Sequence, residues 1–134
     1  WYGKGPHEAY SDRKDGARFG LYEGTVDEMF VNYIYPQENG NRYDVRWVSL
    51  QECSGRGWKV SSGHPLQTSV RYYTNMNMAE AMHPFMLRRS GDVIWHLNHL
   101  MAPVGNESCG GKPLEKYVLR PQVWDFTLIF EYQH

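Results

Sequence analysis

Hydrophobic residues recur at every second position in several stretches of this chain, which is the spacing of strands that bury one face. From Trp124 to Tyr132 each alternate residue is aromatic or leucine, and Val93–Met101 follows a similar rule. Side chains two positions apart lie on the same face of a strand. Val45–Gln51 has apolar residues on both faces, which indicates a central strand.

Shorter strands are predicted between clusters of Gly, Pro, Asn and Ser, which favour turns. They cover Arg18–Thr25, Gly57–Ser61, Gln67–Tyr73 and Tyr117–Leu119, and Ser-Gly-His-Pro is read as the turn before the third of them. One short helix is predicted over Thr74–His83, which has a capping residue, good helix formers and a following proline. The whole pattern indicates an all-β fold, an antiparallel β-sandwich in a single domain over residues 1–134.

Two segments near the start interrupt this pattern. Trp1–Arg13 and Pro36–Arg42 both combine Gly, Pro and Asn with aromatic residues and paired opposite charges. Such segments are typical of ordered surface loops, and ordered polar loops carry function more often than core strands do. They are therefore the first places to search for a site.

Composition narrows the possible partners. The net charge is −1 and no basic run occurs, so neither nucleic acid nor an anionic membrane is an expected partner. No apolar run approaches the length of a membrane span. Aromatic residues make up 15% of the chain, with ten Tyr and five Trp, which suits both a β core and a sugar-binding surface. The chain starts on Trp1 without Met and is expected to be a piece of a longer protein.

The six histidines do not predict a metal site. His96 and His99 are three residues apart on a predicted strand, so they should lie on opposite faces. The spacing of the others matches no zinc motif either: His64 and His83 stand beside prolines, and His134 ends the chain.

A nucleophile is not predicted either. Gly105–Gly111 resembles a nucleophile elbow around Ser108, but Asn106 stands where that motif needs Gly, and no helical pattern follows. Cys109 has no visible His partner or electropositive setting. Cys53 and Cys109 are expected to be free thiols.

Four loop carboxylates could supply the acid pair of a glycosidase. Each has an Arg or Asn nearby, and an adjacent Arg lowers a carboxyl pKa, whereas a catalytic acid needs a raised one. We therefore expect ion-paired loop staples, with no catalytic residue among them: Glu8, Asp12, Glu38 and Glu107.

Trp1–Arg13 fits the pattern W-[FY]-G-x-G-P-x-E-x-Y-x-D-R, which resembles the signature of the last domain of family 2 β-galactosidases. The order continues with Thr25-Val-Asp27, Pro36–Arg42, Asp44–Trp47 and the Gly105–Gly110 loop. The resemblance assigns a structural role to the residues of the first two motifs: Trp1, Gly3, Gly5, Pro6, Glu8, Tyr10, Asp12, Arg13, Pro36, Glu38, Asn39, Gly40 and Arg42.

The resemblance implies a fold for this chain and assigns the catalytic residues to another part of the enzyme. This chain would form the C-terminal half of a β-supersandwich similar to galactose mutarotase. The two catalytic glutamates and Mg²⁺, with Na⁺ as a further candidate, would lie on a preceding TIM barrel. The chain alone would then be inactive and would hold no metal or cofactor. Both the cytoplasm and the periplasm of a bacterium remain open as its compartment.

In that family a loop of the last domain reaches the mouth of the barrel. Here it corresponds to Asn106, Glu107, Ser108 and Cys109, which would lie near the aglycone of a β-galactoside substrate. Cys109 stands where the best-known members have a Trp that stacks on the substrate. A thiol cannot stack in this way, so hydrogen bonds would replace the stacking, and the galactoside need not be lactose. Smaller departures from the family pattern are Ala9, Ser11 and Pro103.

The predicted function is therefore a non-catalytic C-terminal portion of a β-galactosidase. It would support the barrel, shape the aglycone side of the active site and have the barrel and the galactoside as partners. Three alternatives stay open: an independent carbohydrate-binding module, a mutarotase-like epimerase, and a domain that serves only packing or oligomer contacts. The sequence leaves the natural galactoside and the oligomeric state of the intact enzyme undetermined.

Overall fold

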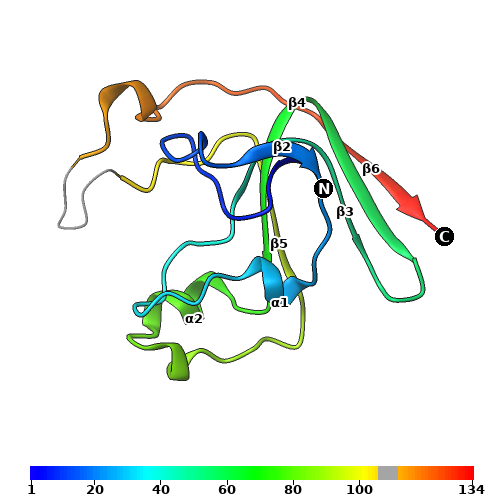
Figure 1. The fold of residues 1–134 in the computed structure, drawn as a ribbon, viewed down its shortest axis with the longest axis horizontal. Helices are drawn as coiled ribbons and strands as arrows, with labels where there is room; N and C mark the ends of the chain where they lie inside the picture. The colour runs from blue at the N-terminus through cyan, green and yellow to red at the C-terminus, as the bar shows by residue number, and fades with distance from the viewer. Residues whose placement is uncertain (106–111) are drawn as a thin grey trace.

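The computed structural model describes residues 1–105 and 112–134 (Figure 1). Its strands form one six-stranded antiparallel sheet in the order β2-β1-β3-β4-β5, with β6 also paired to β4. This confirms a mostly β, antiparallel fold. The strands are β1 (Tyr2–Gly5), β2 (Arg18–Leu21), β3 (Arg42–Gln51), β4 (Gly57–Arg71), β5 (Ile94–Asn98) and β6 (Leu128–Gln133).

β3 is a central strand, as predicted, but for a different reason. Val45 and Val48 are 0% and 8% exposed and both belong to the core, although an odd spacing should separate them. The pairing with β4 shifts register between Val45 and Trp47. Such an irregularity turns later residues to the other face. Val45 and Val48, which the alternation assigns to two faces, therefore both serve one core, whereas Trp47 and Leu50 are not among its members.

The prediction of a turn between two short strands at Ser-Gly-His-Pro is wrong, because β4 runs unbroken through it. β4 changes neighbours there: Ser62 pairs with Leu128 of β6, whereas Gln67 pairs with Asn98 of β5. Pro65 lies between these two ladders and opposite the irregularity of β3. A proline is tolerated where no ladder hydrogen bond is needed from its nitrogen.

In the described part of the chain, α-helices occur at two places instead of one. α2 (Asn75–Glu80) is the predicted helix, shortened, and Thr74 caps it by accepting the Asn77 N–H at 3.1 Å. α1 (Val26–Met29) was not predicted, although Thr25 and Glu28 form a capping box. Two 3₁₀ turns follow later, η1 (Pro84–Met86) and η2 (Glu115–Tyr117). Figure 1 places α1 and α2 near the same end of the sheet.

The remaining strand predictions need smaller corrections. Tyr117–Leu119 is wrong as a strand, since it overlaps η2. The predicted strands at Arg18–Thr25 and Trp124–Tyr132 are shorter, as β2 and β6 show. Tyr2–Gly5 was expected to be a loop but forms β1. Gly3 permits this close pairing, because a Cβ there would lie 2.8 Å from the Val45 Cα.

The core lies on one side of the sheet. Its buried members are Trp1, Met29, Val45, Val48, Val60 and Leu66. A cross-strand aromatic cluster of β4 and β6 is uncovered: Trp58, Phe130 and Tyr132 are 46%, 52% and 46% exposed. Trp58 packs edge-on against both of its neighbours, with ring centroids 6.3 and 5.2 Å apart. In the part of the chain that is described, no helix has the length and apolar character to cross a membrane.

Candidate functional site

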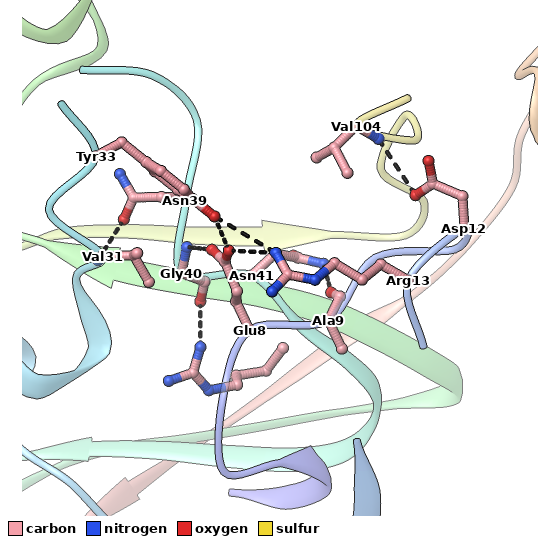
Figure 2. A network of polar contacts seen from close by, with 11 residues as sticks. Glu8, Ala9, Asp12, Arg13, Val31, Tyr33, Asn39, Gly40, Asn41 and Val104 are labelled. Carbon is pink, nitrogen blue, oxygen red and sulfur yellow. Dashed lines mark hydrogen bonds and ion pairs between the residues drawn. The ribbon is translucent and has the colours of Figure 1, made fainter. Parts of the chain in front are cut away.

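The two motif segments meet around the Glu8 carboxylate, which is 4% exposed (Figure 2). One oxygen accepts the Gly40 N–H at 2.8 Å. The other accepts Arg13 Nη1 at 3.0 Å, together with the Tyr33 hydroxyl. The ion pair of Glu8 with Arg13 that the sequence predicts is present. The carboxylate also binds the first motif to the second.

Two asparagines extend this contact between the motifs. Asn41 donates from Nδ2 to the Ala9 carbonyl and to Gln67 Oε1, both at 2.8 Å. Ala9 N–H returns a bond of 2.8 Å to the Asn41 carbonyl. Asn39 accepts the Val31 N–H at 2.9 Å and so holds the segment after α1. Buried amides of this kind fix loop geometry because each lost bond would leave a polar group unpaired.

Arg42 is buried beneath this network, with 3% exposure. Its Nη1 donates to the Gly40 carbonyl at 2.9 Å, and its guanidinium lies 5.0 Å from the Trp1 ring centroid. Nη2 lies 3.2 Å from Met29 Sδ. Burial lowers the pKa of Arg42 to about 10, although the charge of Glu8 opposes this effect. Arg42 thus joins the second motif to the core.

A second buried arginine lies beside Glu38. Arg71 is 1% exposed, and its Nη2 contacts Glu38 Oε2 at 3.2 Å, Asn75 Oδ1 at 2.6 Å and His96 Nε2 at 3.0 Å. Glu38 was expected to be neutralised by Asn39 and Arg42 of its own motif, but its ion pair is made with Arg71. Burial, followed by the charge of Arg71, lowers the pKa of His96.

Tyr10 completes the polar region. Its side chain is 1% exposed. Burial, with the charges of Glu8 and Glu38 nearby, raises the pKa of its hydroxyl. A phenol in this setting holds its proton at neutral pH and is poorly suited to act as a base.

Asp12 was expected to pair with Arg13, as Glu8 does, but it binds backbone N–H groups instead. Its Oδ2 accepts the Gly105 N–H at 2.8 Å and its Oδ1 accepts the Val104 N–H at 3.3 Å. The first motif is therefore tied to a segment far along the chain. Both oxygens of this carboxylate are occupied by backbone donors.

Among residues 1–105 and 112–134, no group of three or more His, Cys, Asp or Glu side chains is arranged to hold a metal ion. His96 is engaged by Arg71, while His99 stacks on Phe126 with ring centroids 5.0 Å apart.

Comparison with known proteins now identifies the family. Residues 1–130 match the family described as beta galactosidase small chain. The chain belongs to this family. The motif resemblance noted in the sequence is thereby confirmed at family level.

The relatives of this small-chain family member are long proteins. The chain is 36% identical over 134 residues to a β-galactosidase of Kluyveromyces lactis, with 98% of the chain and 13% of that protein covered. It is 36% identical over 107 residues to one from Priestia megaterium, covering 80% of the chain and 10% of that protein. A third, from Halalkalibacterium halodurans, is 32% identical over 133 residues, with 98% and 13% covered. The chain thus spans only 10–13% of the length of these curated relatives.

The structure also shows the positions of the other predicted residues of the small-chain motifs. Trp1 stacks on Tyr22 with ring centroids 5.3 Å apart, Gly3 and Gly5 lie in β1, and Pro6 follows a cis peptide bond. Pro36 is buried at the start of the second motif. Cys53 is a free, exposed thiol, as expected. The predicted substrate-proximal residues lie outside the described residues: Asn106, Glu107, Ser108 and Cys109.

Sequence reasoning missed three polar partners of these small-chain motifs. Arg71 and Gln67 lie on the polar side of an alternating stretch, which sequence patterns assign to solvent, yet both are buried. Tyr33 sits in a short irregular segment with no periodic signal. Nothing local marks these residues, because their importance comes from loops that fold onto them from elsewhere in the chain.

Proposed function

We propose that this chain is the non-catalytic portion of a β-galactosidase that supports the TIM barrel and shapes the aglycone side of its active site. One observation carries the proposal: the small-chain family matches residues 1–130, and the chain covers only 10–13% of relatives that are named β-galactosidases. The intact enzyme would hydrolyse terminal β-D-galactosides, and the barrel would be the direct partner of this chain.

The carboxylates of the two motifs support a non-catalytic role. Hydrolysis of a glycoside by a carboxyl pair needs one group that gives up a proton and a second that is free to attack or to activate water. Glu8 and Asp12 have their oxygens occupied by donors, and Glu38 is paired with Arg71. We therefore assign the catalytic glutamates to the barrel. The Mg²⁺ site belongs there in this proposal, as does Na⁺ if it is used.

An uncovered aromatic cluster, on the same face of β4 as the core residue Val60, supports assembly with further chain. A sheet normally buries an apolar face against a second layer. Trp58, Phe130 and Tyr132 form a contiguous cluster that stands about half exposed. Large exposed apolar patches typically mark interaction surfaces. We propose that this sheet is the C-terminal half of a supersandwich, completed by the part of the enzyme that precedes it.

The same aromatic cluster favours a second candidate function. Exposed aromatic rings can stack on the C–H faces of a sugar, so Trp58 and Tyr132 could form the platform of an independent carbohydrate-binding module. Such a module would bind galactosides without any barrel. The two functions therefore differ in a simple experiment.

In the experiment, the enzyme is produced as two polypeptides, divided just before Trp1. The long portion and this chain are purified separately and assayed alone and mixed, with 2-nitrophenyl β-D-galactoside as substrate. We expect neither part to be active alone and the mixture to regain activity with a saturable dependence on this chain. Hydrolysis by the chain alone would overturn the non-catalytic role. Calorimetric binding of galactose or lactose to the isolated chain, without rescue of activity, would favour the binding module.

A further inference from the structure

We infer that the segment leading into Trp1 in the intact enzyme continues β1 as a strand and fills a groove between the end of β2 and the second half of β3. The inference rests on the proposed function, in which further chain of a β-galactosidase precedes Trp1. It adds a backbone interface to the aromatic cluster of Trp58, Phe130 and Tyr132, and it defines the register of the incoming segment.

The groove has the place and the walls that such a strand needs. Its volume is about 920 Å³, and Trp1 lies in its lining. One wall contains Glu23 and Gly24, which follow β2, and the other contains Ser49 and Gln51 of β3. In the sheet β1 lies between β2 and β3, and Figure 1 shows the chain starting there. The two walls are therefore the neighbours that a longer β1 would have.

The pairing of Trp1 with Tyr22 gives the direction of the incoming chain. The backbone nitrogen of Trp1 donates to the Tyr22 carbonyl at 2.7 Å, and the Tyr22 N–H donates to the Trp1 carbonyl at 2.9 Å. Two exchanged bonds define a hydrogen-bonded pair of an antiparallel ladder, and this pair continues the register of Tyr2 opposite Leu21. The β1–β2 ladder is therefore still regular at Trp1, and its next position is opposite Glu23.

The second half of β3 offers backbone groups on the groove side. The Glu52 N–H donates to the Arg56 carbonyl at 2.8 Å, so the even-numbered residues at this end of β3 bond to β4. The N–H and C=O groups of Ser49 and Gln51 then point toward β1, since these directions alternate along a strand. In the described part of the chain β1 pairs with β3 only through Tyr2. Exposed strand edges of this kind accept a further strand.

Both ladders lead to one register for the incoming segment. Continuation of the β1–β3 pairing places the residue immediately before Trp1 opposite Ser49, and the third residue before Trp1 opposite Gln51. Continuation of the β1–β2 pairing places the same segment opposite Glu23 and Gly24. Three residues of strand span about 10 Å. The predicted interface is therefore short, and its pairs are defined individually.

The faces of the strand predict the chemistry of this segment. The second residue before Trp1 lies on the same face as Trp1, which belongs to the core. Across β3 its partner is Leu50, which in turn pairs with the half-exposed Trp58. An apolar side chain at this position covers Leu50 and extends the core toward Trp58. The partner is thus an extended segment with an apolar residue two positions before Trp1.

The test is a register-specific disulfide in the full-length enzyme. Cys53→Ser removes the thiol that lines the groove. A cysteine placed immediately before Trp1 is then combined with Ser49→Cys or, as the matched control, with Gln51→Cys. We expect a disulfide with Ser49→Cys, because the Cα atoms of a hydrogen-bonded pair lie about 5.5 Å apart. The Gln51→Cys pair should form roughly 10-fold less, because diagonal neighbours are about 7–8 Å apart.

Amide hydrogen exchange in the wild-type full-length enzyme gives a second measurement, which requires no substitution. The Ser49 and Gln51 amides should exchange as slowly as those of Val48 and Leu50, which face β4. They should exchange on the order of 10-fold or more slowly than the amide of Ser54, in the exposed turn after β3. Exchange of both amides at the rate of Ser54 would overturn the strand.

The outcomes also separate this inference from the proposed function. If the divided enzyme regains activity on mixing but the Ser49→Cys pair stays reduced, the strand is overturned while the proposed function stands. A disulfide with Ser49→Cys, without recovery of activity on mixing, supports the strand and counts against the proposed function. Equal disulfide formation by both pairs contradicts the register. A disulfide between two copies of the enzyme, seen as a doubled mass, would assign the groove to a second copy and overturn the inference.

Discussion

Replacing Gly40 by alanine probes the tightest contact of the second motif. Gly40 has φ 75°, and a Cβ at this position would lie 2.5 Å from the Met29 carbonyl oxygen, a backbone atom that cannot rotate away. A residue with a Cβ costs about 1–2 kcal/mol in the left-handed region. Overpacking adds about 1–3 kcal/mol. The free energy of unfolding should therefore fall by about 2–5 kcal/mol, a large share of the ~5–15 kcal/mol typical of a domain.

Two further glycines provide the controls for this change. Gly55 also has a positive φ, 88°, but no atom lies within 4 Å of its added Cβ, so Gly55→Ala should lose only the ~1–2 kcal/mol of the backbone conformation. Gly63 has open space and no positive φ, so Gly63→Ala should leave stability unchanged or raise it by up to about 1 kcal/mol. Urea unfolding of the purified chain, followed by tryptophan fluorescence, measures all three. Equal losses for Gly40→Ala and Gly55→Ala would refute the close approach to Met29.

Two other predictions concern the buried charges. Glu8→Ala should lower the free energy of unfolding by about 2–3 kcal/mol because the buried Gly40 N–H loses its acceptor. The side chain of Arg13 is 57% exposed, so Arg13→Ala should lower the free energy of unfolding by about 1 kcal/mol or less. Equal losses of stability in urea unfolding would contradict this order. The pKa of His96 is lowered in the folded chain, so the unfolded chain takes up the proton first as the pH falls. Its contribution to stability is complete above the ordinary pKa of 6.5 and is lost as the pH falls through the lower folded value. His96→Gln should therefore lose less stability than the wild type between pH 7.5 and 5, and identical pH profiles of the urea midpoint would refute this.

The parts of the fold that follow from local patterns could be predicted. Period-two alternation located β5 and most of β6, and the capping residue and helix formers of Thr74–His83 located α2, because these signals depend on residues adjacent in sequence. The interruption expected at Pro65 was misleading, since whether a proline breaks a strand depends on whether a neighbouring strand needs a hydrogen-bond donor at that position, which proline lacks. That information lies in β5 and β6, not in β4.

The polar contacts of the site also divide into those that local sequence predicts and those that it does not. The ion pair of Glu8 and Arg13 joins residues of one motif, so their spacing predicts it. The Gly40 and Tyr33 donors to Glu8, and the Arg71 partner of Glu38, come from other segments and become visible only once the chain is folded. Motif resemblance drew attention to these residues, whereas the three-dimensional contacts show what each one holds.

One edge of β4 pairs with two strands, β5 and β6, and this has a consequence for the order of folding. The β3–β4 hairpin brings Leu50 opposite Trp58 through a short connection, whereas Tyr132 must reach the other side of Trp58 across most of the chain. Contacts between residues distant in sequence form more slowly because a long loop must be closed first. The hairpin therefore forms early, and half of the β4 edge waits for β6. During that interval an open, aromatic strand edge is available to any other chain with unpaired backbone groups, so newly made molecules are most prone to aggregation before β6 arrives.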